Sequence, residues 1–289
     1  MNGLMIQGTS SNAGKSFIVT GLCRLFFNMG VKICPFKSQN MSNYSFRTHD
    51  GGEISVAQAV QAEASNLTPE IFMNPILLKP QNNLSSKIFL NGHEFKLKPG
   101  ENYFKDFTLT HGINAIKKSL EHIENNFDAI IIEGAGSPAE INLNTHEIVN
   151  MRVARLADVP VILVADVDRG GALASVVGTL ELLGDDRERV QGIIFNQFRG
   201  DVELFKPAVT FIENYTGVKV LGVVPFDEDL KIPAEDSLCT NAKNYGETQI
   251  NTFTAKNNVY EKIATLLANN LDINFMKVLL HTKSTLQHQ

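Results

Sequence analysis

The string GTSSNAGKS, at residues 8–16, constrains the fold more strongly than any other stretch of the sequence. The apolar run Leu4–Ile6 precedes it, and apolar residues at helical spacing follow it. A strand, a loop of small residues and a helix in this order predict a phosphate-binding loop, because backbone N–H groups and a helix N-terminus converge on an anion. Lys15 is placed to reach the outer phosphates of a nucleotide, and the Ser16 hydroxyl is placed to ligate Mg²⁺.

The loop departs from the common pattern at its start, where Thr9 occupies the usual position of a glycine and Gly8 lies one place early. A Ser- and Gly-rich turn without a ligand is the structural alternative. The flanking strand and helix patterns favour nucleotide binding. The expected contact residues are Thr9, Ser10, Ser11, Asn12, Ala13, Gly14, Lys15 and Ser16.

Strand-sized aliphatic runs recur along the chain, with helical patterns between them. They are almost continuously apolar, as in strands that are buried on both faces. We expect strands at residues 4–7, 32–35, 129–133, 161–166, 192–196 and 220–224. We expect helices at residues 16–28, 54–65, 107–124, 172–183 and 202–215. The alternation predicts an α/β fold, with a P-loop NTPase-like parallel sheet and helices on both faces.

Polar residues and glycines gather at the ends of these strands. Gly8 follows the first strand and Lys37 the second, while Glu133, Asp166 and Asn196 end the next three. Carboxyl ends of parallel strands meet at one edge of a sheet, where ligands of open α/β sheets bind. The sequence therefore predicts one active site that gathers these groups.

The composition argues against several other functions. The 26 basic and 31 acidic residues give a net charge of −5, without the basic footprint of a nucleic-acid-binding protein. The apolar runs are strand-sized, so we expect no membrane span. Cys23, Cys34 and Cys239 are scattered without metal-ligand spacing, and no signal peptide is visible, which favours a reduced, cytoplasmic chain.

Two carboxylates are candidate ligands for Mg²⁺. Glu133 ends a buried strand and precedes glycines that allow a ligand to approach closely; the alternative is a residue that caps the next turn. Glu53 lies near the expected start of a helix, where it either ligates the metal or interacts with the helix dipole. Lys37 is placed to stabilise a transferred phosphoryl group, unless it is a solvated surface lysine.

Other polar groups near this edge are candidates for ligand binding. Ser38 opens a run of small polar residues, and Lys79 lies between two prolines, in a shaped loop or edge strand. Arg169 can grip a carboxylate through two hydrogen bonds, and Asp166 shares its turn. Asn196 can contact an adenine edge or form a turn. Surface charge and local turn formation are the alternatives for the rest.

The alternation of apolar strand and helix patterns stops near residue 240, where a polar stretch begins. We expect a phosphate-loop domain over residues 1–240 with a helical tail over 241–289. The tail is expected to pack against the sheet or against a partner, such as a second copy in a homodimer. A loop is expected at residues 240–256, and helices at 259–271 and 275–280.

Taken together, the sequence closely resembles the cobyric acid synthases of the cobalamin pathway. The wider family includes cobyrinic acid diamide synthase and dethiobiotin synthetase, in which a threonine also stands at the start of the loop. The resemblance implies a dethiobiotin synthetase-like fold. The matching strings run in order from residue 6 to about residue 238 and are GTSSNAGKS, PFKSQNMS, GGEISVAQAVQAEA, MNPILLKP, EGAGSPAEINL, HEIVNMR, LVADVDRGGALAS, GTLELL, FNQFRGD and LGVVPF.

The resemblance implies a C–N ligase that uses ATP and Mg²⁺ to activate a carboxylate as an acyl phosphate. Ammonia from glutamine then gives an amide, and the family's corrinoid substrate is adenosylcobyrinic acid a,c-diamide, amidated at four carboxylates. It also implies Mg²⁺ ligation by Glu53 and Glu133 beside Ser16. The other implied roles are phosphoryl transfer at Lys15 and Lys37, adenine contact at Asn196, and substrate contacts at Ser38, Lys79, Ser137, Asp166 and Arg169.

The sequence departs from that family in one respect. Its members continue into a glutaminase domain, which needs a cysteine at a sharp turn and a later His-x-Glu pair. After Asp236 the sequence has only Cys239, in a polar stretch, and no His-x-Glu. We therefore expect that glutamine hydrolysis is not encoded here. A longer parent chain, a separate glutaminase subunit and free ammonia all stay open.

Three rival functions are also considered. A nonenzymatic ATPase switch of the partitioning type usually has an extra lysine early in the loop, and residues 9–13 contain none. A remnant that binds nucleotide without turnover is disfavoured by the intact Lys15, Ser16 and Lys37. A related synthetase could act on another carboxylate, such as cobyrinic acid or a dethiobiotin precursor.

Overall fold

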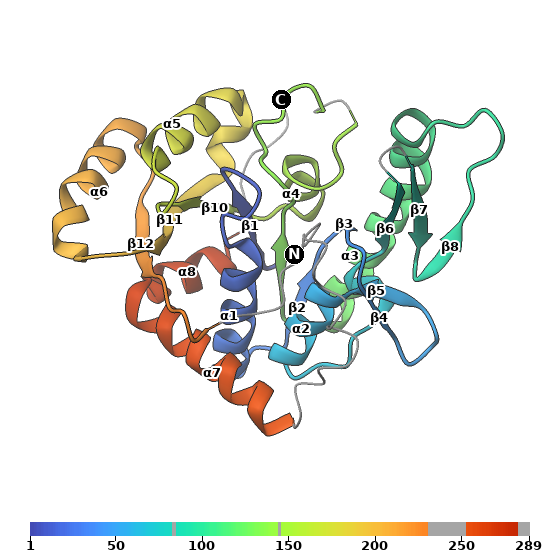
Figure 1. Cartoon of the computed structure of the whole chain (residues 1–289), viewed down its shortest axis with the longest axis horizontal. Coiled ribbons are helices and arrows are strands. Elements are labelled where there is room, and N and C mark those ends of the chain that lie inside the picture. The colour runs from blue at the N-terminus through green and yellow to red at the C-terminus, as the bar shows by residue number, and fades with distance from the viewer. Residues whose placement is uncertain (83–84, 144–145, 231–252, 283–289) are drawn as a thin grey trace.

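A six-stranded parallel sheet forms the centre of the protein (Figure 1). The computed structural model describes residues 1–82, 85–143, 146–230 and 253–282. The strand order β12-β11-β10-β1-β9-β2 confirms all six expected strands and the predicted α/β class. The strands are β1 (Gly3–Gly8), β2 (Ile33–Phe36), β9 (Ala129–Glu133), β10 (Val161–Asp166), β11 (Val190–Phe198) and β12 (Val220–Pro225).

Helices cover both faces of this sheet. The first face carries α1 (Lys15–Asn28), α7 (Phe253–Asn270) and α8 (Ile273–Leu280), and α2 (Val56–Ala64) lies beside α1 and β2. The opposite face carries α3 (Ile113–Asn126), α4 (Met151–Ala157), α5 (Ala172–Leu182) and α6 (Val202–Thr216).

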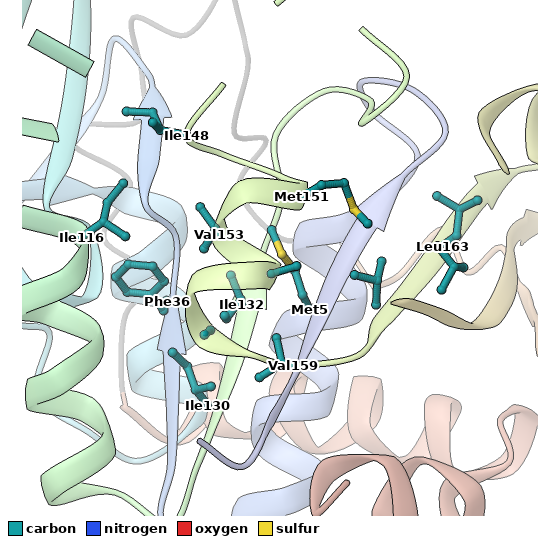
Figure 2. Close-up of a cluster of buried hydrophobic side chains, with 14 of the residues drawn as sticks. Met5, Phe36, Ile116, Ile130, Ile132, Ile148, Met151, Val153, Val159 and Leu163 are labelled. Atoms are coloured by element: carbon teal, nitrogen blue, oxygen red, sulfur yellow. The ribbon is translucent and has the colours of Figure 1, made fainter. Parts of the chain in front are cut away.

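Alternation along each strand divides the core into two layers, because successive side chains point to opposite faces. In β1, Leu4 and Ile6 join the layer under α1, whereas Met5 joins the layer under α4. Figure 2 shows the second layer, where Met151 and Val153 of α4 lie beside the sheet. Both layers consist of buried apolar side chains, which explains why the strands read as almost continuous apolar runs.

Among the described residues, six strands lie outside the central sheet. The sequence predicted none of them, apart from the option of an edge strand around Lys79, and that strand is paired on both sides. Asn91 and Gly92, both at positive φ, form the turn between two of them, as Asn-Gly pairs do in tight hairpins. One group is a four-stranded sheet, β3 (Gln39–Met41), β6 (Ile76–Asn82), β7 (Ser85–Leu90) and β8 (His93–Phe95). The other is an antiparallel pair, β4 (Ser45–Arg47) and β5 (Glu53–Ser55).

Several expected helix starts differ from the structure, including those of the tail helices, which begin at Phe253 and Ile273 rather than at residues 259 and 275. The helix expected from residue 54 begins at Val56, because Ser55 is its N-cap and accepts a hydrogen bond from the Gln58 backbone N–H. The helix expected from residue 107 begins as the π-helical segment η2 (Tyr103–Gly112), and α3 follows it. The remaining short helical turns are η1 (Ile71–Met73) and η3 (Gly184–Arg189).

The C-terminal helices α7 and α8 pack beside α1, on the same face of the central sheet (Figure 1). Arg24 of α1 is buried, lies over the Tyr260 ring of α7 and donates a hydrogen bond to Asn257. The loop expected at 240–256 is wrong over residues 253–256, which belong to α7, and residues 240–252 lie outside the described part. Within the described ranges, no helix has the length and apolarity to cross a membrane.

The contact between α1 and α7 predicts a sharp stability difference between two helical glycines. A Cβ on Gly21 would lie 2.5 Å from Leu267 and 2.7 Å from Ile263, both fully buried. We expect Gly21→Leu to lower the free energy of unfolding by about 1–3 kcal/mol, through overpacking. Gly178 of α5 has open space around its Cβ position, so Gly178→Leu should be neutral or stabilising. Urea denaturation of both variants checks this, and equal losses would contradict it.

Candidate active site

The phosphate loop lies at the point where the strand order reverses. The chain leaves β1 through α1 on one face and leaves β10 through α5 on the other, and open α/β sheets bind ligands beyond the carboxyl ends of strands arranged in this way. Gly14, in the left-handed region with φ of +91°, starts α1 without a side-chain cap. The N-terminal N–H groups of α1 are therefore not taken by a capping side chain, as at an anion-binding helix start.

Lys15 connects this loop to the loop after β9. Its ammonium Nζ donates to the carbonyls of Ser10 and Gly136, each at 3.1 Å. The residue is 6% exposed, so the ammonium is buried between these two loops. The structure thus brings the lysine expected at the phosphates next to the glycines that follow Glu133.

Glu133 is the centre of a buried network. Its Oε1 accepts hydrogen bonds from Ser16 Oγ at 2.9 Å and from Lys37 Nζ at 3.0 Å. Its Oε2 accepts a hydrogen bond from the Gln61 amide of α2. Lys37 is 3% exposed and Glu133 is fully buried. Hydrogen bonds to these partners therefore replace the hydration that both charged groups lose on burial.

The position of Lys37 is fixed by its own backbone. Its N–H donates to the Met73 carbonyl at 2.9 Å, and its carbonyl accepts from the Asn74 amide at 3.0 Å. Asn74 is fully buried and also accepts a hydrogen bond from the Ser55 N–H. Lys37 is thus tied to the segment before β6 and to the start of α2.

The donor set around Ser16 and Glu133 fits a magnesium ion. Mg²⁺ prefers oxygen ligands and is usually held by one or two protein groups, with nucleotide phosphates and water completing the shell. A hydroxyl and a carboxylate oxygen 2.9 Å apart, beside the phosphate loop, provide such a pair. Groups of three or more His, Cys, Asp or Glu side chains suited to an all-protein metal cage do not occur among the described residues.

Glu53 is placed differently from the expectation. It lies on β5, not at the start of α2, and its carboxylate forms an ion pair with Lys79 and accepts a hydrogen bond from Ser45. Although partial burial raises the pKa of Glu53, the hydrogen bonds from Lys79 and Ser45 outweigh it and lower that pKa overall. Glu53 is thus a carboxylate paired with Lys79, and it lies just before the first turn of α2, which contains no acidic residue. A metal role for Glu53 stays a prediction.

The loop after β9 is held by a residue that sequence analysis missed. The Asn150 side chain accepts from the Ala135 N–H at 3.1 Å and donates to the Ala135 carbonyl at 2.7 Å. A Cβ on Gly134 would lie 2.4 Å from Asn150 Oδ1, so this approach requires glycine. Ser137, on the same loop, accepts a hydrogen bond from the Ala139 N–H.

The other expected ligand-binding residues surround this centre with local partners. Arg169 pairs with Asp166 at 3.2 Å, and its side chain is 63% exposed. Ser38 is fully buried and donates to the Ile148 carbonyl at 2.7 Å. Asn196, 3% exposed, donates to the Ala13 carbonyl at 3.0 Å. Thr9 accepts a hydrogen bond from Ser175 of α5. Their roles toward ligands stay predictions.

The two described cysteines are unsuited to nucleophilic chemistry. Burial raises the pKa of Cys23 to about 12 and raises that of Cys34 as well. Both thiols therefore stay protonated at neutral pH, and a protonated thiol is a poor nucleophile. Cys239 lies outside the described residues.

The parallel sheet, the loop before α1 and the buried Ser16–Glu133–Lys37 cluster define a nucleotide-binding domain of the P-loop class. The chain belongs to the family described as the CobQ/CobB/MinD/ParA nucleotide binding domain, whose model matches residues 4–239.

Curated proteins similar to this chain include cobyric acid synthases. A cobyric acid synthase from Geobacillus kaustophilus is 53% identical over 236 residues, which cover 81% of this chain and 47% of the relative. One from Desulfitobacterium hafniense is 50% identical over 243 residues, which cover 83% of this chain and 47% of the relative. The chain thus spans about half the length of the curated relatives it matches.

Among solved structures, MinD of Pyrococcus horikoshii in complex with Mg-ADP is similar to this chain, at 15% sequence identity. The likeness covers 91% of this chain and 94% of that one, with a TM-score of 0.43. A likeness of this size supports no inference about function.

The cluster at Glu133 predicts a metal-specific defect. Glu133→Gln removes the negative charge that would hold Mg²⁺ beside Ser16 while keeping the shape of the side chain. We expect the gain in ATP affinity on adding Mg²⁺ to fall about tenfold or more, with a smaller change in affinity measured in EDTA. Calorimetry under both conditions checks this, on protein shown to be folded by circular dichroism. An equal loss in both conditions would indicate a purely structural Glu133.

Gln61 gives a second prediction, with a matched control on the same helix. Gln61→Leu removes the donor to Glu133 Oε2, whereas Gln58→Leu removes an equally buried amide that bonds Asn40 and Ser55 instead. We expect Gln61→Leu to raise the Mg²⁺ concentration for half-maximal nucleotide binding several-fold, because the carboxylate loses its orientation. Gln58→Leu should leave that concentration unchanged, even if both variants are less stable. Equal shifts would refute the assignment.

Proposed function

We propose that this domain is the ATP-dependent amide-forming part of a cobyric acid synthase, a C–N ligase of cobalamin biosynthesis. The observation that carries the proposal is the junction of Ser16, Lys37 and Glu133 beside the phosphate loop. A hydroxyl, a carboxylate and a buried lysine beside this loop support the proposal, because phosphoryl transfer requires Mg²⁺ ligands and positive charge at the outer phosphates of ATP. The names of relatives at about 50% identity supply the substrate class.

The reaction proceeds in two steps. A carboxylate oxygen of the substrate attacks the γ-phosphorus of ATP, and the bond from this phosphorus to the β-phosphate oxygen breaks. ADP is the leaving group, and the product is an acyl phosphate. Ammonia then attacks the acyl carbon, the bond to phosphate breaks, and loss of a proton gives the amide and inorganic phosphate. Ser16 and Glu133 would hold Mg²⁺, which would supply neutralisation of the phosphate charge. The catalytic demands on the chain are therefore positioning and positive charge.

The residues divide these tasks between them. The phosphate loop and Lys15 hold the phosphates, and Lys37 stabilises the negative charge of the transferred group. Lys37 can do so while paired to Glu133, because the carboxylate would share its charge with Mg²⁺ as a ligand together with Ser16. Two lysines against one carboxylate leave a net positive charge beside the triphosphate, before any metal is bound.

The substrate proposed is adenosylcobyrinic acid a,c-diamide, whose peripheral carboxylates become amides in adenosylcobyric acid. Arg169, exposed at the carboxyl edge of the sheet, is available for such carboxylates. Lys79, Ser137 and Asp166 are proposed to line the same side. Ser38 would act through the loop it braces, since its hydroxyl already bonds Ile148. The ammonia would come from glutamine through a glutaminase domain or subunit, or from free ammonium.

An amidation assay tests the proposal directly. The purified chain is incubated with ATP, Mg²⁺ and adenosylcobyrinic acid a,c-diamide, together with either ammonium or glutamine, and products are followed by mass spectrometry. We expect stepwise gain of amides with ammonium and none with glutamine, because both described thiols are buried and protonated. Absence of product with ammonium, in protein that binds ATP, would overturn the assigned reaction or substrate.

A phosphate-loop variant serves as the control. Lys15→Ala should abolish ATP turnover, since the ammonium is held between the two loops that would enclose the phosphates. Its thermal unfolding curve should stay cooperative, because the Lys15 ammonium bonds two loop carbonyls and the residue is not a member of either hydrophobic core cluster. Normal turnover in this variant would remove the phosphate-loop assignment itself.

A further inference from the structure

We propose that Asn196 and Gln197 form an amide clamp that holds the phosphate loop in its nucleotide-binding shape. Both residues lie on β11 (Val190–Phe198), and together they bond two successive peptide units of the loop. The proposal rests on the nucleotide-binding role proposed above. It gives Asn196 a task beyond the adenine contact implied by resemblance, and it gives Gln197 a positioning role.

The two contacts are directed at adjacent carbonyls. Asn196 Nδ2 donates to the Ala13 carbonyl at 3.0 Å, and Gln197 Nε2 donates to the Asn12 carbonyl at 3.0 Å. A peptide unit is planar and trans, so its N–H points opposite to its C=O. Carbonyls drawn toward β11 therefore turn the N–H groups of Ala13 and Gly14 away from β11. The clamp sets the direction of the donors on which phosphate binding depends.

The fit between Asn196 and the loop is tight. Asn196 is 3% exposed, and a Cβ on Gly14 would lie only 2.0 Å from its Nδ2. The amide thus occupies the space that any side chain at position 14 would need. The glycine required by the φ of +91° is also required by this approach, so the loop and the end of β11 fit only in combination.

Both sides of the second contact are in an unfavourable backbone conformation. Asn12 has φ of +61° and Gln197 has φ of +60°, although neither is glycine. Residues without a special reason rarely adopt this region, and glutamine less readily than asparagine. Such conformations persist where the surrounding structure enforces them, and they gather at ligand sites. Here the turn at Gln197 directs its amide back to the loop.

The clamp makes a prediction that a base contact does not. An adenine contact affects only ligands that carry the base, whereas a clamp affects every ligand bound through phosphates. We therefore compare ATP with inorganic tripolyphosphate, each with Mg²⁺, for wild type and for Asn196→Ala. We expect affinity for both ligands to fall by about tenfold, so that their ratio stays unchanged. Displacement of a fluorescent nucleotide measures both affinities in one format.

Two further variants support the comparison. Gln197→Ala should weaken both ligands in the same proportion, by a smaller factor because this residue is half-buried. Gln191→Ala is the matched control, since this exposed amide lies at the other end of β11 and bonds Glu188. It should leave both affinities unchanged.

The outcomes separate this proposal from the one on which it rests. If Asn196→Ala weakens ATP but not tripolyphosphate, the clamp is wrong and the base contact is right. If neither ligand is weakened by Asn196→Ala and Gln197→Ala, the clamp is also wrong. Failure of the amidation assay, with both affinities reduced in parallel in the variants, would reject the assigned reaction and leave the clamp standing.

Discussion

The buried carboxylate of Glu133 is the interaction on which the site depends. Glu133 ends β9 and accepts hydrogen bonds from Ser16 of α1, from Lys37 directly after β2 and from Gln61 of α2. A carboxylate without water needs such partners, and an ammonium as buried as Lys37 needs the carboxylate. Three elements that meet β9 are therefore fixed relative to one another by one charge. Hydrophobic burial brings these elements together, and this charge determines how they align.

The central fold could be predicted from the sequence because its physical signal is local. Each strand of the parallel sheet is buried on both faces and reads as a continuous apolar run, as Ala129–Glu133 does. The smaller sheets gave no such signal, because strands such as Gln39–Met41 and Glu53–Ser55 are three residues long and partly exposed. Their stability comes from long-range pairing, and within them the Asn91-Gly92 turn is a local cue.

The residues of the site also fall into those that the sequence could predict and those that it could not. Lys15, Lys37 and Glu133 could be found because they are charged and stand directly at strand or loop ends. Gln61 and Asn150 could not, because an amide inside or beside a helix looks the same in sequence whether it faces water or a buried partner. The pairing of Glu53 with Lys79 escaped sequence analysis for a similar reason. Its partner Lys79 lies 26 positions away, and the contact between β5 and β6 brings them together.

Amides, rather than further charges, hold the charged groups of this site in place. Asn74 fixes the backbone of Lys37, Asn150 fixes the loop after β9, and Gln61 orients Glu133. An amide offers both a donor and an acceptor, so it can brace a backbone without changing the net charge of the site. Additional carboxylates would neutralise Lys15 and Lys37, and additional cations would compete for Glu133. Neutral bracing leaves the excess positive charge of the lysines available to an anionic ligand, as electrostatic catalysis requires.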